Sequence, residues 1–199
     1  MTVPIFVNNN ELVSLGFITL DVHPVLTEFD SLWEQVESDN KCNRNYYNHI
    51  ATWYGDVDYA YTGVRHTAQK MPFCFQKIAR QLEDTLVYPV NYFNCLLVNL
   101  YTNKGIAPHS DDEAIFLEND GTVGAVATIS LGATATATIT RNDRSEDPFS
   151  IKLTDGSCYI MPEGDFQNKY KHSVSTPNPD NNRSNWCDQR ISLTFRHIP

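Results

Sequence analysis

The chain has 199 residues, of which 41% are hydrophobic and 12% aromatic, and its formal net charge is −9 at pH 7. This length suits a single domain with a sizeable core, and the composition excludes wholesale disorder. The negative charge argues against long-range attraction to nucleic acid, although it leaves room for a local basic groove.

The cysteines and the longest uncharged stretch indicate the compartment. The five cysteines are odd in number and scattered without a CxxC pair, so we expect reduced thiols rather than a disulfide framework or a zinc site. The N-terminus lacks the basic and apolar regions of a signal peptide. The uncharged stretch 121–140 alternates Ala and Thr, which is typical of strands and not of a membrane span. We therefore expect a cytoplasmic protein with no membrane segment.

Two helices are expected in the first ninety residues. Apolar residues recur at helical spacing over 24–39, and Pro24 suits a first helical turn. A second amphipathic pattern covers 73–87. Residues 3–20 are predicted as short strands around the Asn8-Asn9-Asn10 turn. The first helix is expected to cover one face of a sheet.

The segment 41–72 combines aromatic and basic residues with many Asn, Gly and Asp. Its rings and cations are Tyr46, Tyr47, Trp53, Tyr54, Tyr59, Tyr61, Lys41, Arg44, Arg65, His66 and Lys70. Single-stranded nucleic acid needs such a set, because rings stack on bases and cations neutralise phosphates. The alternative is that the tyrosines pack a loop against the core and keep their hydroxyls in water.

From residue 90 onward the chain is predicted as short strands and turns. The expected strands are 94–101, 124–131, 133–140, 149–154, 157–161, 170–174 and 190–198. Gly132 lies between two alternating runs, where we expect a bulge or a sharp bend. Several short strands after two helices indicate a jelly roll or barrel with helices on one side.

A histidine and a carboxylate follow the strand predicted at 94–101. If the backbone there is extended, His109 and Asp111 point to the same side. One histidine and one carboxylate are two of the three ligands in the facial triad that binds non-haem Fe(II). His172 is the candidate for the third ligand, since among the six histidines it lies in a strand-like segment after a turn of small and polar residues. The alternative is an acidic surface turn with an unrelated histidine.

The last predicted strand alternates between polar and apolar residues. Its polar face carries Arg190, Ser192, Thr194 and Arg196. Two arginines that face a barrel interior need anionic partners. A dicarboxylate co-substrate would supply them, because a guanidinium group binds a carboxylate through two parallel hydrogen bonds. The alternative is an edge strand with arginines on its solvent face.

Five motifs occur in a fixed order along the second half of the chain. They are NxY at Asn99 and Tyr101, HxDDE at 109–113, SLGAT at 130–134, KHSV at 171–174 and RxSLTFR at 190–196. With these motifs the chain resembles the AlkB family of Fe(II)- and 2-oxoglutarate-dependent dioxygenases. The match is strong over 90–199.

Two further stretches extend the resemblance. WYGD at 53–56 and YAYTG at 59–63 weakly resemble the family's nucleotide-recognition lid. MPEG at 161–164, followed by Phe166-Gln167 and by 171–174, is similar to AlkB domains within plant RNA-virus polyproteins. The chain can therefore be part of a larger viral polyprotein.

The resemblance implies an α+β, mainly β fold: a double-stranded β-helix, or jelly roll, with N-terminal helices packed on one side and a nucleotide-recognition lid. It implies one domain over 1–199, with the helices and the lid in 1–89 and the catalytic core in 90–199. Iron would be held by His109, Asp111 and His172. The residues for 2-oxoglutarate would be Asn99, Tyr101, Arg190, Ser192, Thr194 and Arg196, with Ser192 where family members often have Asn. The residues around the methylated base would be Tyr54, Tyr59, Tyr61, Asp112 and Glu113.

The activity that the resemblance implies is oxidative demethylation of N-methylated bases, of the 1-methyladenine and 3-methylcytosine type, in single-stranded RNA or DNA. It would use Fe(II), O2 and 2-oxoglutarate and release formaldehyde, succinate and CO2. A carboxylate at Asp112 or Glu113 would favour a cationic methylated base over the neutral product. We expect a monomer, in the host cytoplasm if the chain is viral. Two alternatives stay open: a hydroxylase of the same fold that acts on a protein or small molecule, and a catalytically silent jelly-roll module that binds RNA or a protein partner.

Overall fold

A computed structural model describes residues 51–61, 64–101, 105–175 and 190–199 with their side chains, and the backbone of the strand segments 3–4, 17–18, 43–44 and 49–50. The helix expected at 24–39 and the Asn8-Asn9-Asn10 turn lie outside the described residues. Two short strands occur within the stretch 3–20, as expected. They are β1 (Val3–Pro4) and β2 (Phe17–Ile18), and they pair in an antiparallel manner.

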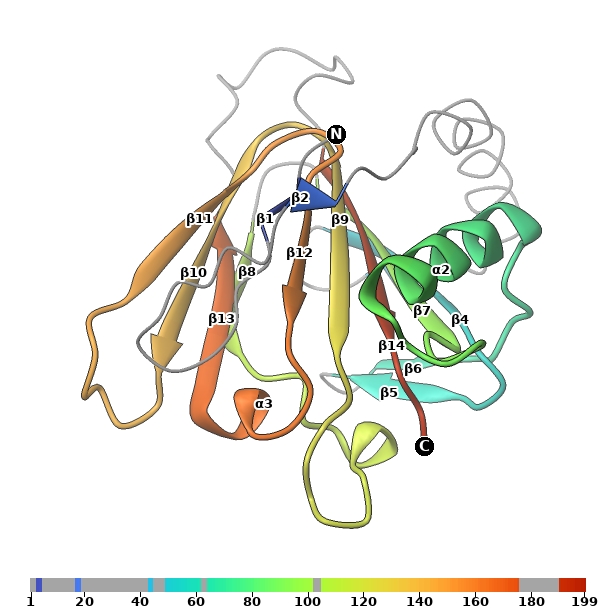
Figure 1. Ribbon diagram of the computed structural model, residues 1–199. Coiled ribbons are helices and arrows are strands. Elements are labelled where there is room, and N and C mark those ends of the chain that lie inside the picture. The colour runs from blue at the N-terminus through green and yellow to red at the C-terminus, as the bar shows by residue number, and fades with distance from the viewer. Residues whose placement is uncertain are drawn as a thin grey trace.

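Two antiparallel sheets make up most of the described chain (Figure 1). The order in the larger sheet is β12 (Cys158–Met161), β9 (Val126–Gly132), β14 (Arg190–Arg196), β7 (Cys95–Tyr101), β4 (His49–Tyr54) and β3 (Asn43–Arg44). The order in the smaller sheet is β11 (Phe149–Leu153), β10 (Ala135–Arg141), β13 (Tyr170–Ser175) and β8 (Ile106–His109). The chain crosses between the sheets repeatedly from β7 to β14, which confirms the mainly β jelly roll.

The strands predicted from residue 90 onward are all present, with small shifts at their ends. Gly132 has a φ of +80° at the end of β9, where the chain bends away from the larger sheet toward β10 in the smaller one. Glycine suits this left-handed conformation because it has no Cβ. The predicted bend is confirmed. The strand β8 was not predicted, since it is short and contains Pro108.

The helix α2 (Phe73–Leu86) covers the outer face of the larger sheet (Figure 1). Its residues Phe75, Ile78 and Leu82 repeat at helical spacing and are almost fully buried. They share one apolar cluster with Leu193 and Phe195 of β14. Burial of each such side chain contributes roughly 1.5–3 kcal/mol to stability. The helix expected at 73–87 is confirmed, and the apolar face of β14 lies beneath it.

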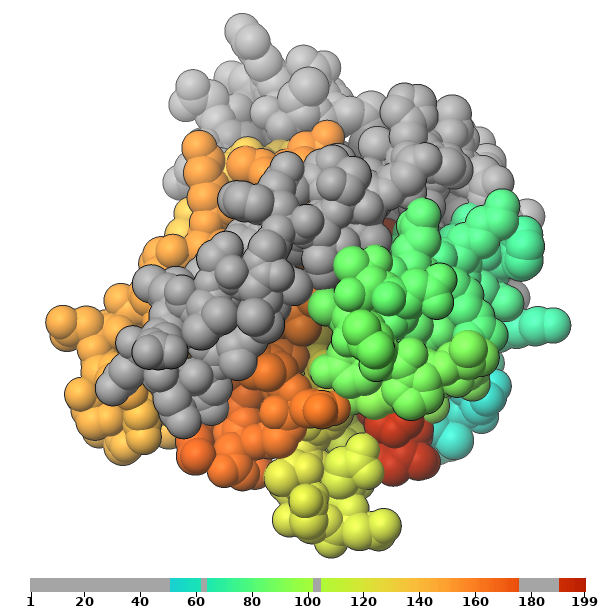
Figure 2. All heavy atoms as spheres, viewed as in Figure 1, coloured from blue at the N-terminus to red at the C-terminus, as the bar shows by residue number. Residues whose placement is uncertain are grey.

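The C-terminal residues pack against the segment that follows α2. The ring of His197 stacks on Tyr92 at 4.4 Å, and its Nδ1 donates to the Tyr92 carbonyl at 2.9 Å. The Tyr92 hydroxyl accepts a hydrogen bond from the backbone N–H of Ala125 at 2.8 Å. In Figure 2 the C-terminal residues (red) lie between the α2 region (green) and the projecting segment before β9 (yellow). These contacts fix the end of β14, which carries Arg196.

The segment 41–72 is more regular than its composition suggested. β4 pairs with β7 in the larger sheet, and β5 (Tyr59–Tyr61) pairs with β6 (Val64–His66) as a separate hairpin. Within β4, Trp53 belongs to an apolar cluster with residues of β5 and β7, while Tyr54 belongs to the cluster under α2. This alternation is the ordinary pattern of a strand. The strand was not predicted because the surrounding Asn, Gly and Asp residues are typical of loops.

The described helices include none that is long and apolar enough to cross a membrane. Cys74, Cys95 and Cys158 are buried and form no disulfide with one another, while Cys42 and Cys187 lie outside the described side chains. Burial raises the pKa of the Cys95 and Cys158 thiols to about 12. Neither is therefore a thiolate at neutral pH, which argues against nucleophilic catalysis by these two residues.

Candidate active site

His109, Asp111 and His172 meet between the two sheets. β8 ends at His109 and pairs with β13 so that His109 lies directly opposite His172. One ligand atom from each of the three residues lies within 4.8 Å of the other two. Asp111 follows the end of β8 and has 1% of its surface exposed. The predicted cluster is thus assembled by a strand pairing that joins two distant parts of the chain.

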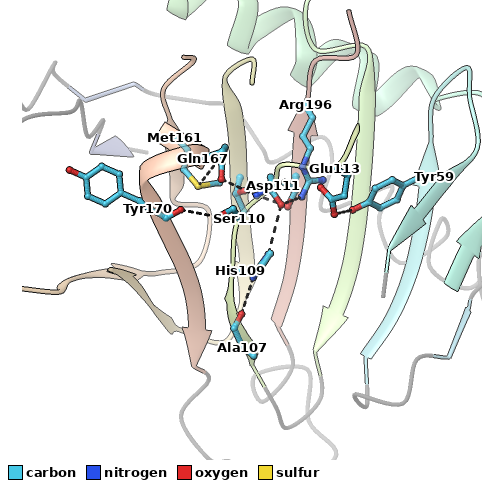
Figure 3. Close-up of polar contacts among 12 residues, drawn as sticks. Tyr59, Ala107, His109, Ser110, Asp111, Glu113, Met161, Gln167, Tyr170 and Arg196 are labelled. Atoms are coloured by element: carbon cyan, nitrogen blue, oxygen red, sulfur yellow. Dashed lines mark hydrogen bonds and ion pairs between the residues drawn. The ribbon is translucent and has the colours of Figure 1, made fainter. Parts of the chain in front are cut away.

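A backbone carbonyl determines the orientation of the His109 ring. Nδ1 of His109 lies 2.9 Å from the carbonyl oxygen of Ala107, and Nε2 lies 3.8 Å from Oδ1 of Asp111 (Figure 3). Since a carbonyl can only accept, Nδ1 carries the proton and the lone pair of a neutral ring is on Nε2. This is the usual arrangement of a metal-binding histidine, in which the nitrogen away from the metal is hydrogen-bonded.

The charge states of the buried ligands suit a cation. Burial alone would raise the pKa of Asp111, but the Arg196 guanidinium and the two histidines hold it well below its ordinary value. Burial lowers the pKa of His172 to about 4. At neutral pH the site therefore offers an ionised carboxylate and a neutral imidazole, which are the forms that coordinate metals.

Several buried polar atoms around the cluster have no hydrogen-bond partner among the described residues. They are Oδ2 of Asp111, Nδ1 of His172, and Nε and Nη1 of both Arg190 and Arg196. Buried polar groups in folded proteins are nearly always paired, so this concentration is unusual. A metal cation fits the carboxylate and imidazole atoms, and a carboxylate-bearing anion fits the guanidinium atoms. The residues present therefore fit a metal ion together with an anionic co-substrate.

The polar face of β14 lines the same pocket, as its alternation predicted. The triad borders this pocket, and so do all the residues expected to bind the co-substrate. These are Asn99, Tyr101, Arg190, Ser192, Thr194 and Arg196. The apolar residues of β14 face α2 instead. The pocket also has lining residues that the sequence did not single out for this role, namely Thr128, Tyr159 and His66.

The two arginines have different surroundings. Arg196 donates to Oδ1 of Asp111 at 2.9 Å, so its charge already has an anionic partner. Arg190 is 1% exposed, donates to the Ser130 hydroxyl at 3.0 Å and lies over the Tyr101 ring at 5.1 Å. Among the described residues no carboxylate pairs with Arg190. Arg190 is therefore the cation of this pocket that most needs an external anion.

Two tyrosines of the β5–β6 hairpin border the pocket at different depths. Tyr61 is partly exposed, and its ring centroid lies 6.0 Å from that of His109. Tyr59 is 1% exposed and stacks on Trp53 at 4.6 Å. The Tyr59 hydroxyl donates to Oε1 of Glu113 at 2.8 Å (Figure 3). Tyr61 is thus the outer ring, while Tyr59 supports it and holds Glu113.

Two residues expected near the substrate, Tyr54 and Asp112, are not among the residues that line the pocket. Tyr54 is in the apolar cluster under α2, with its ring 5.7 Å from Phe75, because strand alternation turns it away from the pocket side of β4. Asp112 is exposed, on a segment where its neighbours Asp111 and Glu113 are buried or partly buried. The structure argues against the predicted role of Tyr54, while the role of Asp112 stays a prediction. Alternation along β4 was the signal that could have excluded Tyr54, since Ala51, two positions before Trp53 on the other face, borders the pocket.

The fold and the site define a jelly-roll protein that can hold a metal ion and an anionic co-substrate side by side. The family model described as 2OG-Fe(II) oxygenase superfamily matches residues 22–196. The chain therefore belongs to the 2OG-Fe(II) oxygenase superfamily, and its fold is AlkB-like. Its cofactors are Fe(II) and 2-oxoglutarate, and the His-Asp-His cluster fits iron binding.

The proteins similar to this chain include a viral polyprotein and a protein of solved structure. The chain is 31% identical over 139 residues, or 69% of its length, to the RNA replication polyprotein of Apple stem pitting virus (isolate PA66). It spans only 5% of the length of that polyprotein. It is also similar in fold to the solved structure of OsALKBH1, with a TM-score of 0.56 and 18% identity, over 85% of this chain and 93% of that one.

Proposed function

We propose that this chain catalyses oxidative demethylation of N-methylated bases in single-stranded RNA. The proposal is carried by one polar pocket that combines a His-Asp-His cluster, an arginine without a carboxylate partner among the described residues, and the partly exposed ring of Tyr61. These features suit a metal ion, a carboxylate and a stacked base respectively.

His109, Asp111 and His172 would hold Fe(II). When bound, Fe(II) with O2 and 2-oxoglutarate supplies hydroxylation of the N-methyl group, which is then lost as formaldehyde while succinate and CO2 are released. Arg190 would bind a carboxylate of 2-oxoglutarate, since its Nε and Nη1 have no hydrogen-bond partner among the described residues. Further hydrogen-bonding groups for the co-substrate would come from Asn99, Tyr101, Ser192, Thr194 and Arg196.

Tyr61 and Glu113 would form the substrate side of the pocket. Oε2 of Glu113 is buried without a hydrogen-bond partner, while Oε1 accepts from Tyr59. Burial and the nearby Asp111 charge raise the pKa of Glu113. A cationic group beside Glu113 would stabilise its charged carboxylate. Methylation on the Watson–Crick face of adenine or cytosine gives such a cation and also weakens base pairing, which lowers the cost of extracting the base.

The wider context is part of the proposal. RNA is favoured over DNA because the viral relative is an RNA replication polyprotein. We propose one domain over 1–199, with a substrate lid before residue 90 and a catalytic core after it. The chain would act as a monomeric domain of a longer polyprotein in the host cytoplasm.

The test is direct. Purified protein is incubated with Fe(II), 2-oxoglutarate, O2 and single-stranded RNA that contains 1-methyladenine or 3-methylcytosine, and the nucleosides are analysed by mass spectrometry. We expect methyl loss matched by succinate formation, and no methyl loss with Asp111→Ala. Succinate without methyl loss would refute the demethylase proposal. Absence of iron and 2-oxoglutarate binding would refute the assignment of the pocket as well.

A hydroxylase that acts on a protein or small molecule is the second candidate. The net charge of −9 favours it, because RNA is itself an anion. The two candidates differ in salt dependence. If RNA is the substrate, its KM should rise with ionic strength, since phosphate contacts weaken in salt.

A further inference from the structure

Asp111 lies beyond the end of β8, where the backbone is no longer paired with a neighbouring strand. β8 ends at His109, and residues 110–113 belong to no strand or helix. The backbone N–H of Asp111 donates instead to Oε1 of Gln167 at 2.9 Å, across 56 positions of sequence. A buried N–H that loses its acceptor is unfavourable, so this bond holds the backbone of a proposed metal ligand in place.

Gln167 is buried in a way that suits this contact. It has 1% of its surface exposed and belongs to α3 (Phe166–Lys169), which leads directly into β13. Its Nε2 donates to Sδ of Met161 at 3.4 Å. Because the Asp111 N–H can only donate, the amide oxygen must face Asp111, and the orientation of the amide is determined. A position that only filled space would take an apolar residue.

A second bond joins the same two segments. The Ser110 hydroxyl donates to the backbone carbonyl of Tyr170 at 3.0 Å. Figure 3 shows both bonds running from residues 110–111 to the stretch that contains Gln167 and Tyr170. His172 follows on the same strand, β13. The carboxylate ligand and the histidine ligand are thus tied to each other through a short piece of chain.

We propose that Gln167 is a positioning residue for the metal site, whose amide oxygen fixes the Asp111 backbone so that the carboxylate meets His109 and His172 at one point. The proposal rests on the metal triad of the proposed function. Arg196 holds the Asp111 side chain through Oδ1, and Gln167 holds its backbone. With both contacts Asp111 is fixed at its side chain and at its backbone. The Arg196 contact alone would leave the backbone N–H of Asp111 without a hydrogen-bond acceptor.

The test is a calorimetric titration of the metal-free protein with Mn(II) alone, which gives the Kd for Mn(II). Gln167→Met keeps the length and approximate volume of the side chain but removes the acceptor. We expect its Kd for Mn(II) to rise about 10- to 100-fold, as is usual when a partner of a metal ligand is lost. At saturating Fe(II), kcat should recover toward the wild-type value. Met161→Leu is the matched control, since it removes the other partner of the same amide, and its Kd should not change.

Two outcomes would overturn the proposal. Wild-type Mn(II) affinity in Gln167→Met would mean that the bond to Asp111 is unimportant, and equal weakening in Met161→Leu would mean that packing is responsible. If Gln167→Met does not fold, Gln167→Asn, which is too short to reach Asp111, is titrated in its place with the same two outcomes. Failure of the proposed function is recognised separately, because then the wild-type protein binds no Mn(II) or Asp111→Ala binds it equally well.

Discussion

Arg196 donates from Nη2 to Oδ1 of Asp111 at 2.9 Å, and the side chains of both residues are almost fully buried. The guanidinium group also lies over the ring of Phe116 at 5.3 Å. The pair joins the last strand of the larger sheet to the segment after β8 in the smaller sheet. It holds the pKa of Asp111 below its ordinary value, although burial acts in the opposite direction. The carboxylate is therefore charged and oriented before any metal binds.

Removal of Arg196 should destabilise the metal-free protein, because Asp111 is then left buried without its ion-pair partner. For Arg196→Met we expect the free energy of unfolding in urea to fall by about 3–5 kcal/mol. Mn(II) should restore part of this loss, since the cation compensates the Asp111 charge. Arg65→Met is the control, because its ion pair with Asp58 is on the surface and should contribute little. Equal stability of Arg196→Met and the wild type would contradict the structural role of the pair.

Arg190 should act on 2-oxoglutarate and not on the metal. In Arg190→Met we expect the KM for 2-oxoglutarate to rise roughly 10- to 100-fold, the effect of losing hydrogen bonds to a charged group. The Kd for Mn(II) should stay at the wild-type value, since Arg190 bonds to Ser130 and not to the triad. Thr194→Val, which removes a hydroxyl from the same face of β14, should have a smaller effect. A Mn(II) affinity that falls together with the 2-oxoglutarate affinity would argue for collapse of the pocket.

The features that could be predicted from the sequence depend on neighbours along the chain. The alternation of Arg190, Ser192, Thr194 and Arg196 with apolar residues defines two faces of β14 without knowledge of its partners. The structure places the polar face on the pocket and the apolar face under α2. The bend at Gly132 is local in the same sense, because it follows from a single glycine between two alternating runs.

The features that could not be predicted depend on contacts between distant segments. Tyr54 was expected in the pocket, but the pairing of β4 with β7 puts Trp53 on the pocket side and Tyr54 under α2. The contact between Gln167 and Asp111 spans 56 positions and depends on the path of the chain before β13. The same limit holds for Arg196, whose partner Asp111 is 85 positions away. No local pattern in the sequence predicts these contacts between distant segments.

Tyr61 should contribute to RNA use without being needed for co-substrate turnover. Tyr61→Ala should raise the KM for methylated RNA about 10- to 100-fold, as expected for the loss of one stacked ring. Decarboxylation of 2-oxoglutarate in the absence of RNA should continue, because Tyr61 contacts the His109 ring but makes no hydrogen bond to the triad among the described residues. Tyr54→Phe is the matched control, since its ring lies on the opposite side of the larger sheet next to Phe75. Loss of both activities in Tyr61→Ala would count against a role confined to the substrate.

Glu113 should distinguish cationic from neutral bases through its charge. Glu113→Gln retains an oxygen that can accept the hydrogen bond from Tyr59, so the position of the side chain should be preserved. It removes the buried negative charge, and we expect the preference for 3-methylcytosine over a neutral methylated base to fall roughly tenfold, which corresponds to about 1.4 kcal/mol. The measurement is the ratio of kcat/KM values for two RNA oligomers that differ only in the methylated base. Asp112→Asn removes the same charge from the neighbouring exposed position and should leave the ratio unchanged. If Asp112→Asn changes the ratio as much as Glu113→Gln, the effect comes from the overall charge of this segment and not from a carboxylate that contacts the base.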